Sequence, residues 1–522
     1  VDADRRDGVC ANAEGQCSLR AAVMEANTST PLGIADTIVL SPGTYQLTIP
    51  EVDRGFDSDV DGDLVFLQFE PVAIVGAGPA RTTIEQTAGH RVMSVRGGGD
   101  VDLSGVTVTG GDVTRAGDHA GGGGGGIFNA GMLAVRHARI NGNRAETAGG
   151  GIGQLALAGP SLELDHVTVR NNEAGTGGGV SASSALMRFA TVRDNVAVSG
   201  GGIGGSVELR NSLVAGNRAV GSPFSSHGGG LRGGGLVVDT TIRGNRAEVG
   251  GGGIATRDRG SLRVERSTLV ANEAREGGGV FLEGFGRFTN STLNDNHATA
   301  DGGAIFQRRS GFADARRPEL VLESSTLAEN TAGSGVDGIA DAGGIQQVVG
   351  TILANGENCG DPVDDSIGWN LETGTSCELG GPGDLSSTGP GLRPLTDNGG
   401  ATWTHAIRAD SPAIDANAFS RCPGLDQRTA LRPAGERCDI GSYERDAAFL
   451  PTPLRPSRGS SSSAGSRTSS SCRSSPPRWR RRGSRSSPPA GPRAMGRAPD
   501  SRLSSGTASS RGATPPSSSA GG

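Results

Sequence analysis

The chain has 522 residues, of which 89 are glycine and only 3% are aromatic, so it lacks the large side chains that fill a thick globular core. Its net charge of −6 combines two unlike parts, because residues 446–522 carry thirteen arginines against two aspartates, a charge of +11, which leaves −17 for residues 1–445. An acidic body of this kind argues against nucleic acid as a partner, since phosphate binding needs a basic surface.

Six of the seven cysteines form close pairs in the sequence. The pairs are Cys10 with Cys17, Cys359 with Cys377 and Cys422 with Cys438, and Cys472 is left over. This spacing indicates three disulfides and an oxidising compartment, with free thiols as the alternative. No C-x-x-C pair is present, so a zinc site is not expected. We also expect no transmembrane span, because no apolar run is long enough.

The N-terminal segment predicts a short helix followed by strands. Residues 17–27, CSLRAAVMEAN, place Leu19, Ala22, Val23 and Ala26 at helical spacing, which predicts an amphipathic helix that caps the first layer of the fold. Residues 36–49 predict a strand, a turn and a second strand, and the segments VAIVGAG and TTIEQ that follow predict two more strands.

Four aspartates alternate between these strands, at Asp57, Asp59, Asp61 and Asp63. In a turn they would converge on calcium, a hard cation that prefers carboxylate oxygens, and calcium is the one cofactor that the sequence suggests. As an extended hairpin they would share one solvated face instead. The spacing imitates the start of an EF-hand loop, but the twelfth position falls on Gln68, so both interpretations stay open.

The middle of the chain repeats a fixed frame around asparagine. A branched aliphatic residue stands three positions before each Asn, a small residue, usually Ala, Ser or Thr, five before, an apolar residue eight before and an alanine two after. Gly111 takes the Asn place in an earlier turn. The asparagines of the frame are Asn143, Asn172, Asn195, Asn217, Asn245, Asn272, Asn296 and Asn330.

Successive frame asparagines are 22 to 34 residues apart, so a constant rung is joined by loops of variable length. Apolar residues two apart indicate strands, and the odd step between the positions eight and five before Asn requires a bend between two strands. Rungs of this kind predict an all-β fold, a single-stranded right-handed parallel β-helix, in which Val169, Val192 and Val214 lie in one column.

Each predicted rung turns at its Asn and again at a glycine block. Asn tolerates the left-handed backbone, and in register its amide bonds to the next Asn, which predicts a ladder. Blocks such as 149–151 and 200–202 are followed by Ile152 and Ile203, so we expect the aliphatic residue to begin an inward strand. No Lys follows, as a phosphate loop needs, and the Asp of calcium-binding nonapeptides is missing.

The C-terminal part contains a charged group and a polar tail. We interpret the carboxylates of the group as partners of its two arginines, since a catalytic carboxylate pair would lack a supporting base or nucleophile pattern. The group consists of Asp426, Arg428, Arg432, Asp439 and Glu444. Residues 446–522 predict a disordered tail, interpreted either as a basic arm for acidic polymers or as a frame-shifted end.

Three regions together resemble a group of bacterial surface proteins. CSLRAAVMEAN, with the downstream pattern I-x-L-x-x-G-x-Y-x-L, is similar to the Cys-Ser-Leu-Arg-Glu-Ala N-terminal domain, with Ala21 where that domain usually has Glu. The Asn and Gly rungs resemble the right-handed parallel β-helix repeats that commonly follow it. Within residues 388–444, DQRTALRP and CDIGSYE resemble the choice-of-anchor module that ends many such proteins.

This resemblance covers most of residues 8–445. It implies an exported protein, secreted or at the bacterial cell surface or outer membrane, of adhesin-like or polysaccharide-associated type. The hydrophobic anchor that often ends the family is missing from residues 446–522. We expect a monomer whose exposed ladder faces and variable loops, such as 221–234 and 307–318, contact a polysaccharide or a cell-surface ligand.

A polysaccharide lyase or glycoside hydrolase is the alternative, because parallel β-helices often act on polysaccharides. The rungs, however, contain none of the N-T-D, D-D, G-H-G and R-I-K motifs of polygalacturonase-like enzymes, and Asp364-Asp365 stands outside them. His119 and His227 lie beside glycine blocks, and we interpret both as solvated surface groups. No catalytic residue is therefore assigned, although side chains from different rungs can converge.

The sequence predicts four segments. They are an N-terminal cap (1–50), the β-helix repeats (51–356), a capping or anchor-type module (357–445) and the tail (446–522). The function that we expect is a scaffold that presents a ligand-binding surface without catalysis.

Overall fold

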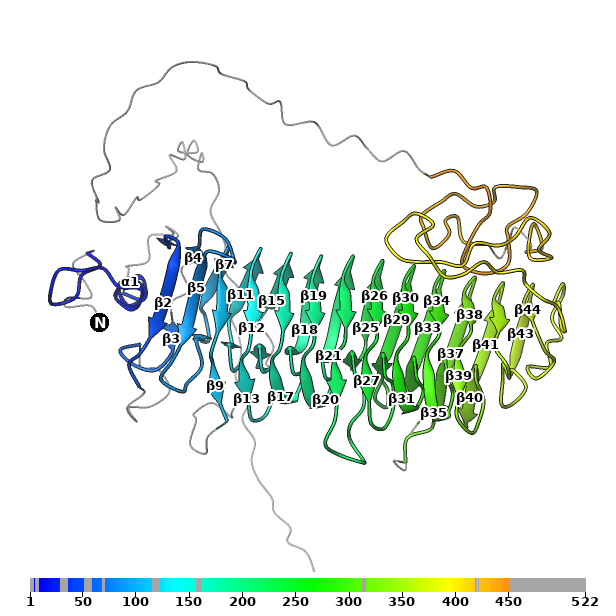
Figure 1. Cartoon of the computed structure of the whole chain (residues 1–522), viewed down its shortest axis with the longest axis horizontal. Helices are drawn as coiled ribbons and strands as arrows, with labels where there is room; N and C mark the ends of the chain where they lie inside the picture. The colour runs from blue at the N-terminus through cyan, green and yellow to red at the C-terminus, as the bar shows by residue number, and fades with distance from the viewer. Residues whose placement is uncertain are drawn as a thin grey trace, which may run out of the picture. The chain divides into compact units, whose positions relative to one another are not determined.

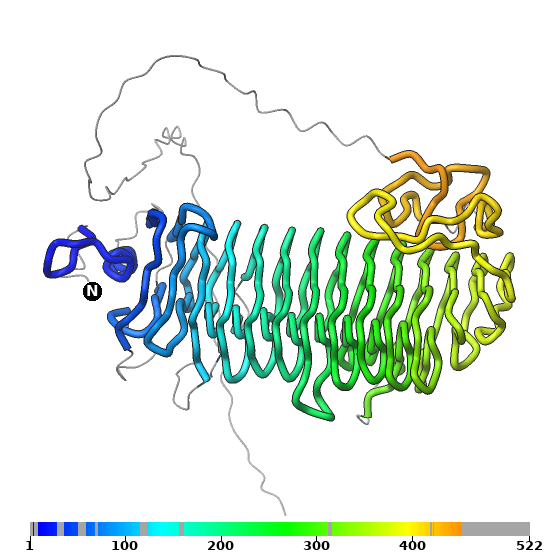
Figure 2. Tube along the Cα trace, viewed as in Figure 1, coloured from blue at the N-terminus to red at the C-terminus, as the bar shows by residue number. Residues whose placement is uncertain are grey.

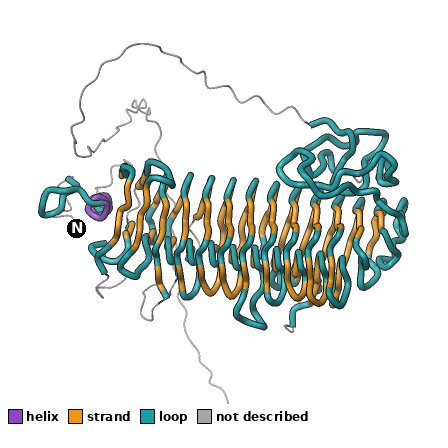
Figure 3. The backbone as a smooth tube through the Cα atoms, viewed as in Figure 1, coloured by secondary structure: helices purple, strands orange, loops and turns teal. Residues whose placement is uncertain are grey.

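The computed structural model describes residues 4, 9–28, 36–50, 59–67, 71–114, 123–155, 161–311, 316–417, 420 and 422–449, all of which lie in one compact unit, Val1–Arg480. These residues contain one helix and 44 strands, and the strands pair in parallel in three sheets (Figures 1 and 3). The predicted parallel β-helix is therefore confirmed. The predicted tail lies outside the described residues, except for residues 446–449.

The one described helix, α1 (Leu19–Ala26), caps the start of the stack as predicted. The Ser18 side chain accepts a hydrogen bond from the Ala21 backbone N–H at 3.2 Å and so caps the first turn. Val23 is 1% exposed and belongs to the same apolar core as Leu64 and Ile38 of the first strands. The helix thus covers the end of the stack with apolar side chains, where bare strand edges would otherwise meet water.

Sheet A consists of two ladders that merge in the long strands β18 (Val180–Arg188) and β21 (Ile203–Arg210). Ladder A1 also contains β3 (Leu64–Phe66), β6 (Met93–Val95), β10 (Ile127–Asn129), β14 (Ile152–Gln154), β24 (Leu231–Arg232), β28 (Ile254–Ala255), β32 (Val280–Leu282), β36 (Ile305–Arg308) and β40 (Ile339–Ala342). Ladder A2 also contains β1 (Asp36–Val39), β4 (Pro71–Val75), β7 (Asp100–Ser104), β11 (Met132–Arg136), β15 (Ser161–Asp165), β25 (Gly235–Val238), β29 (Ser261–Glu265), β33 (Phe285–Thr289), β37 (Glu319–Glu323), β41 (Ile345–Val349) and β43 (Asp365–Gly368).

Sheet B carries the second strand of each rung, with the aliphatic residue three positions before Asn pointing inward. It contains β2 (Gly43–Leu47), β5 (Thr82–Gln86), β8 (Thr107–Thr109), β12 (Arg139–Asn141), β16 (Thr168–Arg170), β19 (Thr191–Arg193), β22 (Leu213–Ala215), β26 (Thr241–Arg243), β30 (Thr268–Val270), β34 (Thr292–Asn294), β38 (Thr326–Ala328), β42 (Ile352–Ala354) and β44 (Leu371–Glu372). Figure 2 shows that the rungs follow one another in chain order.

Sheet C, which the sequence did not predict, lies between the Asn corner and the glycine block. It contains β9 (Asp112–Val113), β13 (Arg144–Ala145), β17 (Glu173–Thr176), β20 (Val196–Ser199), β23 (Arg218–Ala219), β27 (Arg246–Ala247), β31 (Glu273–Glu276), β35 (His297–Asp301) and β39 (Thr331–Ala332). Its strands are two to five residues long and turn little more than the frame alanine inward. These segments are too short to show the alternation of apolar and polar residues from which a strand is predicted.

The core consists of columns of stacked aliphatic side chains. Val169 pairs in register with Val192, and Val192 with Val214, and all three are 0% exposed. Ile152 and Ile203, which follow glycine blocks, are also fully buried. The predicted columns and the inward start after each glycine block are therefore confirmed.

The Asn corner forms the predicted ladder. In each step, the backbone N–H and the side-chain amide of one Asn donate to the Oδ1 of the next, for example from Asn195 to Asn217 at 3.0 and 2.9 Å. Gly111, in the Asn place, donates its N–H to Asn143 Oδ1 at 3.0 Å and joins the same ladder. The left-handed backbone, however, lies one residue earlier, as at Asn171 (φ 54°) and Asp194 (φ 56°), so that part of the prediction was wrong. The frame Asn therefore contributes its side-chain amide to the corner, and the residue before it adopts the left-handed backbone.

The bend predicted before Asn is also present, as one left-handed residue between ladder A2 and sheet B. Examples are His166 (φ 55°) and Phe189 (φ 50°). Next to it, the small residues five positions before Asn form a second polar ladder in later rungs, in which Ser212 N–H donates to Thr240 Oγ1 at 3.2 Å. The sequence frame recorded these residues only as small, although their hydroxyls bond successive rungs together.

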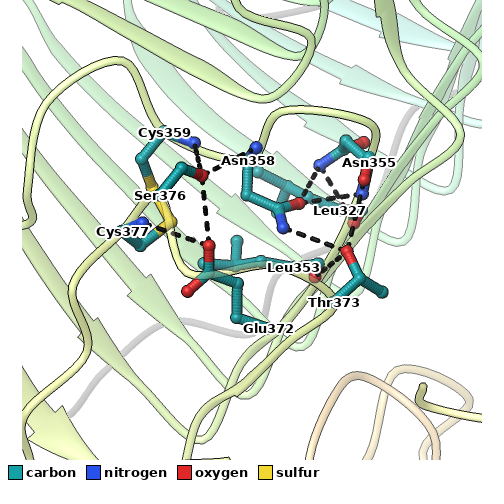
Figure 4. The surroundings of a disulfide bond; sticks show 9 residues. All are labelled: Leu327, Leu353, Asn355, Asn358, Cys359, Glu372, Thr373, Ser376 and Cys377. Atoms are coloured by element: carbon teal, nitrogen blue, oxygen red, sulfur yellow. Dashed lines mark hydrogen bonds between the residues drawn. A yellow bond between two sulfur atoms is a disulfide. The ribbon is translucent and has the colours of Figure 1, made fainter. Parts of the chain in front are cut away.

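The Asn ladder ends beside a disulfide (Figure 4). Asn355 donates to Asn358 Oδ1, and Asn358 donates through its side chain to Thr373. The next residue, Cys359, is bonded to Cys377, whose N–H donates to the Glu372 carboxylate at 3.1 Å. Pairing of Cys10 with Cys17 and of Cys422 with Cys438 confirms all three predicted disulfides. Ladder pairing runs from β1 to β44, so it extends into the segments 1–50 and 357–445.

Candidate functional site

The predicted acidic turn encloses a side chain of the protein itself. The Arg20 guanidinium donates to the backbone carbonyls of Asp59 (3.1 Å), Asp61 (3.1 Å) and Asp63 (2.9 Å). The three aspartates are 6%, 4% and 6% exposed, so the interpretation of an exposed hairpin was wrong for them. Asp57 lies outside the described residues.

Arg20 supplies a positive charge at this turn, in the region where calcium was expected. Burial lowers the pKa of Arg20, and the nearby carboxylates of Asp63, Asp61 and Asp59 oppose that shift. Among the described residues, no three His, Cys, Asp or Glu side chains are arranged to hold a metal ion. Because Asp57, one of the four expected ligands, lies outside the described residues, calcium binding at this turn stays a prediction.

Both loop histidines were interpreted as solvated surface groups, and the structure tests this interpretation only for His227. His119 lies outside the described residues. His227 is only 5% exposed and packs edge-on against the Phe281 ring, with 5.0 Å between ring centroids, so its interpretation as a solvated surface group was wrong. Burial lowers its pKa to about 4, and the neighbouring Arg232 adds to this shift. A partner from another rung buries this histidine, and a linear sequence does not reveal such contacts.

The charged group of the C-terminal part forms buried ion pairs, which confirms the predicted partners of its arginines. Arg428 contacts Asp426 at 2.7 Å, and Arg432 contacts Glu444 at 3.5 Å. Burial raises the pKa of Glu444 to about 7, against the influence of Arg432. Asp439 accepts hydrogen bonds from the backbone N–H groups of two loop residues. All five side chains are buried, so the group is internal to the fold.

Residues 388–449, which we call the C-terminal module, are attached to the outer face of sheet B through a row of threonines. The row occupies the position four residues before the frame Asn and includes Thr268, Thr292 and Thr326. Thr268 Oγ1 donates to the Trp403 carbonyl at 2.7 Å, and Thr292 Oγ1 donates to Gln427 Oε1 at 2.7 Å. The outward threonine row of sheet B thus holds the C-terminal module of the same chain in place.

The same row continues beyond the module into a groove. Thr241 pairs with Thr268, Leu213 with Thr241, and Thr191 with Leu213. Over these rungs lies an open cavity of about 410 Å³, which we call the sheet B groove. It is lined by Phe189, Ala190, Thr191, Asn211, Ser212, Leu213, Asp239, Thr241 and, from the module, Ala401.

Aromatic rings extend this groove along the bend between ladder A2 and sheet B. The Phe189 ring, half-exposed at 50%, stacks on His166 with 4.7 Å between centroids, and His166 contacts His137 at 4.9 Å. The three occupy the left-handed position of successive rungs, and Asn211 and Asp239 follow in the next two. Four rung steps of about 4.8 Å give a strip about 19 Å long from His137 to Asp239.

Positively charged side chains outnumber negatively charged ones around the groove. Its one carboxylate, Asp239, accepts two hydrogen bonds from Arg266, at 2.8 and 3.1 Å, and this pairing raises the pKa of Arg266. Beside the groove, sheet B turns Arg170, Arg193 and Arg243 outward. Of these, only Arg193 has an ion-pair partner among the described residues, and that partner is its neighbour Asp194. The groove therefore offers donors and hydroxyls, with no free carboxylate.

The outer face of ladder A2 is different, because its charges pair with one another across rungs. Arg136 contacts Asp102 at 2.5 Å, and Arg188 contacts Glu163 at 2.7 Å. Sequence reasoning missed the sheet B groove, although the threonines four positions before Asn were a signal for it. Their outward direction became informative only once the register of sheet B was known.

The comparisons with known proteins concern the fold. No family model and no curated protein matches the sequence. Among solved structures, the chain is similar to the A-module of the Azotobacter vinelandii mannuronan C-5 epimerase AlgE6, with TM-score 0.40 and 14% identity over 68% of this chain and 96% of that one. It is also similar to the pectate lyase Pel9A, with TM-score 0.36 and 13% identity over 85% and 94%. Nothing about the chemistry of this chain follows from such likenesses.

Proposed function

We propose that the protein is a secreted or cell-surface scaffold that binds a polysaccharide along the sheet B groove and does not cleave it. The three disulfides are consistent with an oxidising compartment outside the cytosol. No helix in the described part of the chain is long and apolar enough to span a membrane. The sequence resemblance to adhesin-like surface proteins points in the same direction.

The observation that carries the proposal is the threonine row. In later rungs it binds the C-terminal module through hydroxyl groups, and in the groove it presents Thr241 and Thr191 with no described residue bonded to either side chain. Leu213 stands between these two threonines, so their hydroxyls lie two rungs, about 9.6 Å, apart, a spacing that suits a ligand that is itself a repeating chain of hydroxyl-bearing units.

The ring of Phe189 completes the recognition surface. An exposed aromatic face stacks on the apolar face of a sugar ring, and such aromatic groups commonly dominate the energy of an interface. Asn211, at the next rung, supplies an amide that both donates and accepts. Rings and amides at successive rungs would hold an extended polysaccharide parallel to the stack.

The alternative, a polysaccharide lyase or glycoside hydrolase, has less support. Hydrolysis of a glycosidic bond usually needs two carboxyl groups that face the scissile bond. The groove has one carboxylate, Asp239, and Arg266 already engages it with two hydrogen bonds. A binding role needs no such pair, so it agrees better with these side chains.

The test is affinity electrophoresis of the full chain against a panel of neutral and acidic polysaccharides. We expect at least one polysaccharide to retard the protein, and Phe189→Ala to weaken that binding about tenfold, the equivalent of about 1.4 kcal/mol. The matched control is Phe224→Ala, because Phe224 is 88% exposed and does not line the groove. The proposal is contradicted if Phe189→Ala and Phe224→Ala are retarded equally. It is also contradicted if no polysaccharide of the panel retards the unmodified protein.

A further inference from the structure

A second cluster of side chains lies away from the groove, on the outer face of ladder A1. We call it the arginine corner, and it consists of His227, Arg232, Arg257, Glu276, Phe281, Glu283 and Arg308. Two loops that the sequence marked as contact regions contribute to it, since His227 and Arg232 lie in 221–234 and Arg308 lies in 307–318.

Strand register brings these residues together. Arg232 pairs with Ala255, and Ala255 with Phe281, in successive strands of ladder A1. On the other side of the glycine block, His227 bridges to Gly250. A Cβ on Gly250 would lie 2.5 Å from the Phe281 ring and 3.0 Å from the His227 ring. The missing side chain therefore lets both rings close over this position.

The corner has more positive than negative groups. Arg308 lies over the Phe281 ring at 4.6 Å and uses both carboxylates, Glu283 at 3.1 Å and Glu276 at 3.6 Å. Arg232 has no ion pair among the described residues, and its Nε and Nη1 atoms are buried without a hydrogen-bond partner. Burial lowers the pKa of Arg232, as do its neighbours Arg257 and Arg308, whereas Glu283 opposes the shift.

His227 lies close to Arg232, and its ring also lies near the Ser225 backbone. His227 is 5% exposed, and its Nδ1 is buried without a partner. Buried donors without acceptors are costly, and the planar guanidinium of arginine matches a carboxylate through two parallel hydrogen bonds. An anionic group bound at Arg232 would supply the missing acceptors and balance the excess charge.

A cavity of about 370 Å³ adjoins the corner, and Glu283 belongs to both. Its lining includes Arg259, Arg316, Arg317, Glu283, Glu319 and Phe285. This volume falls in the range of small-ligand sites, and its arginines extend the positive surface beyond one anionic group. A ligand with several anionic groups and a compact body between them therefore fits better than a single free ion.

We infer that the arginine corner binds an acidic saccharide, with the guanidinium of Arg232 holding one of its carboxylate groups. The acidic body of the chain does not prevent this, because charges more than about 8 Å apart are largely screened at physiological ionic strength. The inference is independent of the proposed function, since no residue of the arginine corner lines the sheet B groove.

The test is isothermal titration of the full chain at low ionic strength with three probes: tetragalacturonate, the neutral tetrasaccharide maltotetraose, and inorganic sulfate. We expect tetragalacturonate to bind, maltotetraose not to bind, and Arg232→Gln to weaken tetragalacturonate binding at least tenfold. Glu283→Gln is expected to strengthen binding severalfold, because it removes a negative charge beside the site. The matched control is Arg263→Gln, on the exposed face of β29.

Folding is separated from binding by thermal unfolding of the same variants. Because Arg232 is partly buried without an ion pair, we expect Arg232→Gln to keep or raise the melting temperature, whereas an arginine with a purely structural role would lower it. Unchanged tetragalacturonate affinity in Arg232→Gln overturns the inference, as does equal binding of maltotetraose. Binding of sulfate alone overturns the saccharide assignment. Phe189→Ala is expected to leave binding at this site intact.

Discussion

At the scale of the residue, the frame asparagine joins the rungs on both sides of it through its side-chain amide. Asn217 Oδ1 accepts from the N–H and the amide of Asn195, and its own amide donates to the Val192 carbonyl and to Asn245. Every one of these groups is buried. Because each Asn satisfies the donors of the rung before it, replacing one leaves orphaned donors on its neighbour.

We therefore predict that Asn217→Ala lowers the free energy of unfolding by about 3 kcal/mol, since two buried donors of Asn195 lose their acceptor at about 1–3 kcal/mol each. Chemical denaturation followed by circular dichroism measures this loss. The control is Asn171→Gly, which removes an exposed Asn where the backbone is left-handed and glycine is tolerated. A similar loss in both variants contradicts the ladder argument.

His227 gives the fold a dependence on pH. Its pKa is lowered to about 4 in the folded protein by burial and by Arg232, whereas an unfolded histidine titrates near 6.5. Between these values the unfolded chain binds a proton that the folded chain does not. The contribution of His227 to the free energy of unfolding is therefore fully present above about pH 6.5 and is lost as the pH falls toward 4.

We predict that His227→Gln reduces the loss of stability between pH 6.5 and pH 4 by about 2 kcal/mol, somewhat less than the full shift at 1.36 kcal/mol per pH unit. Urea denaturation of both proteins across this range measures the difference. Glu444 acts in the opposite direction, because its raised pKa costs stability as the pH rises from about 4.5 to about 7, and its contribution cancels between the two proteins. Identical pH profiles would show that His227 is protonated in the folded state.

At the scale of the element, the glycine block explains why the rungs close. Gly200 has φ 65°, and a Cβ on Gly202 would lie 2.7 Å from the Gly230 carbonyl oxygen and 2.9 Å from the Asn217 side chain. The backbones of successive rungs approach so closely here that even a methyl group has no room. The block and the Asn ladder therefore depend on each other.

We predict that Gly202→Ala destabilises the protein by about 2 kcal/mol, the typical cost of forcing extra atoms into a packed interior. The thermal unfolding midpoint measures it. Gly311→Ala serves as the control, because Gly311 has no positive φ and no atom within 4 Å of an added Cβ. If both substitutions leave the unfolding midpoint unchanged, the close backbone approach at Gly202 does not exclude a larger residue at that position.

The sequence was sufficient to predict those elements whose residues carry a period. The columns through Val169 and Val192, the Asn ladder and the helix at 19–26 were predicted because spacing alone places these side chains. Sheet C was missed because its strands are too short to show a pattern. The burial of His227 and the role of Thr268 were missed because their partners lie on other rungs or in the C-terminal module.

At the scale of the whole molecule, the two long faces of the stack have separate roles. Ladder A2 neutralises its own charges across rungs, as Arg188 and Glu163 do, and so offers few free groups to a ligand. Sheet B binds the C-terminal module at Thr268 and Thr292 and leaves the same row open at Thr191. Under the proposed function, the ligand therefore binds along the side of the stack and not at its end.

The most direct test of this account is the molar mass of a polysaccharide that the protein binds, measured by size-exclusion chromatography with light scattering during prolonged incubation with the full chain. We predict that the protein elutes together with the polysaccharide and that the mass of the polymer stays constant. A polymer mass that falls with time would contradict binding without cleavage, and separate elution from every polysaccharide tested would contradict binding itself.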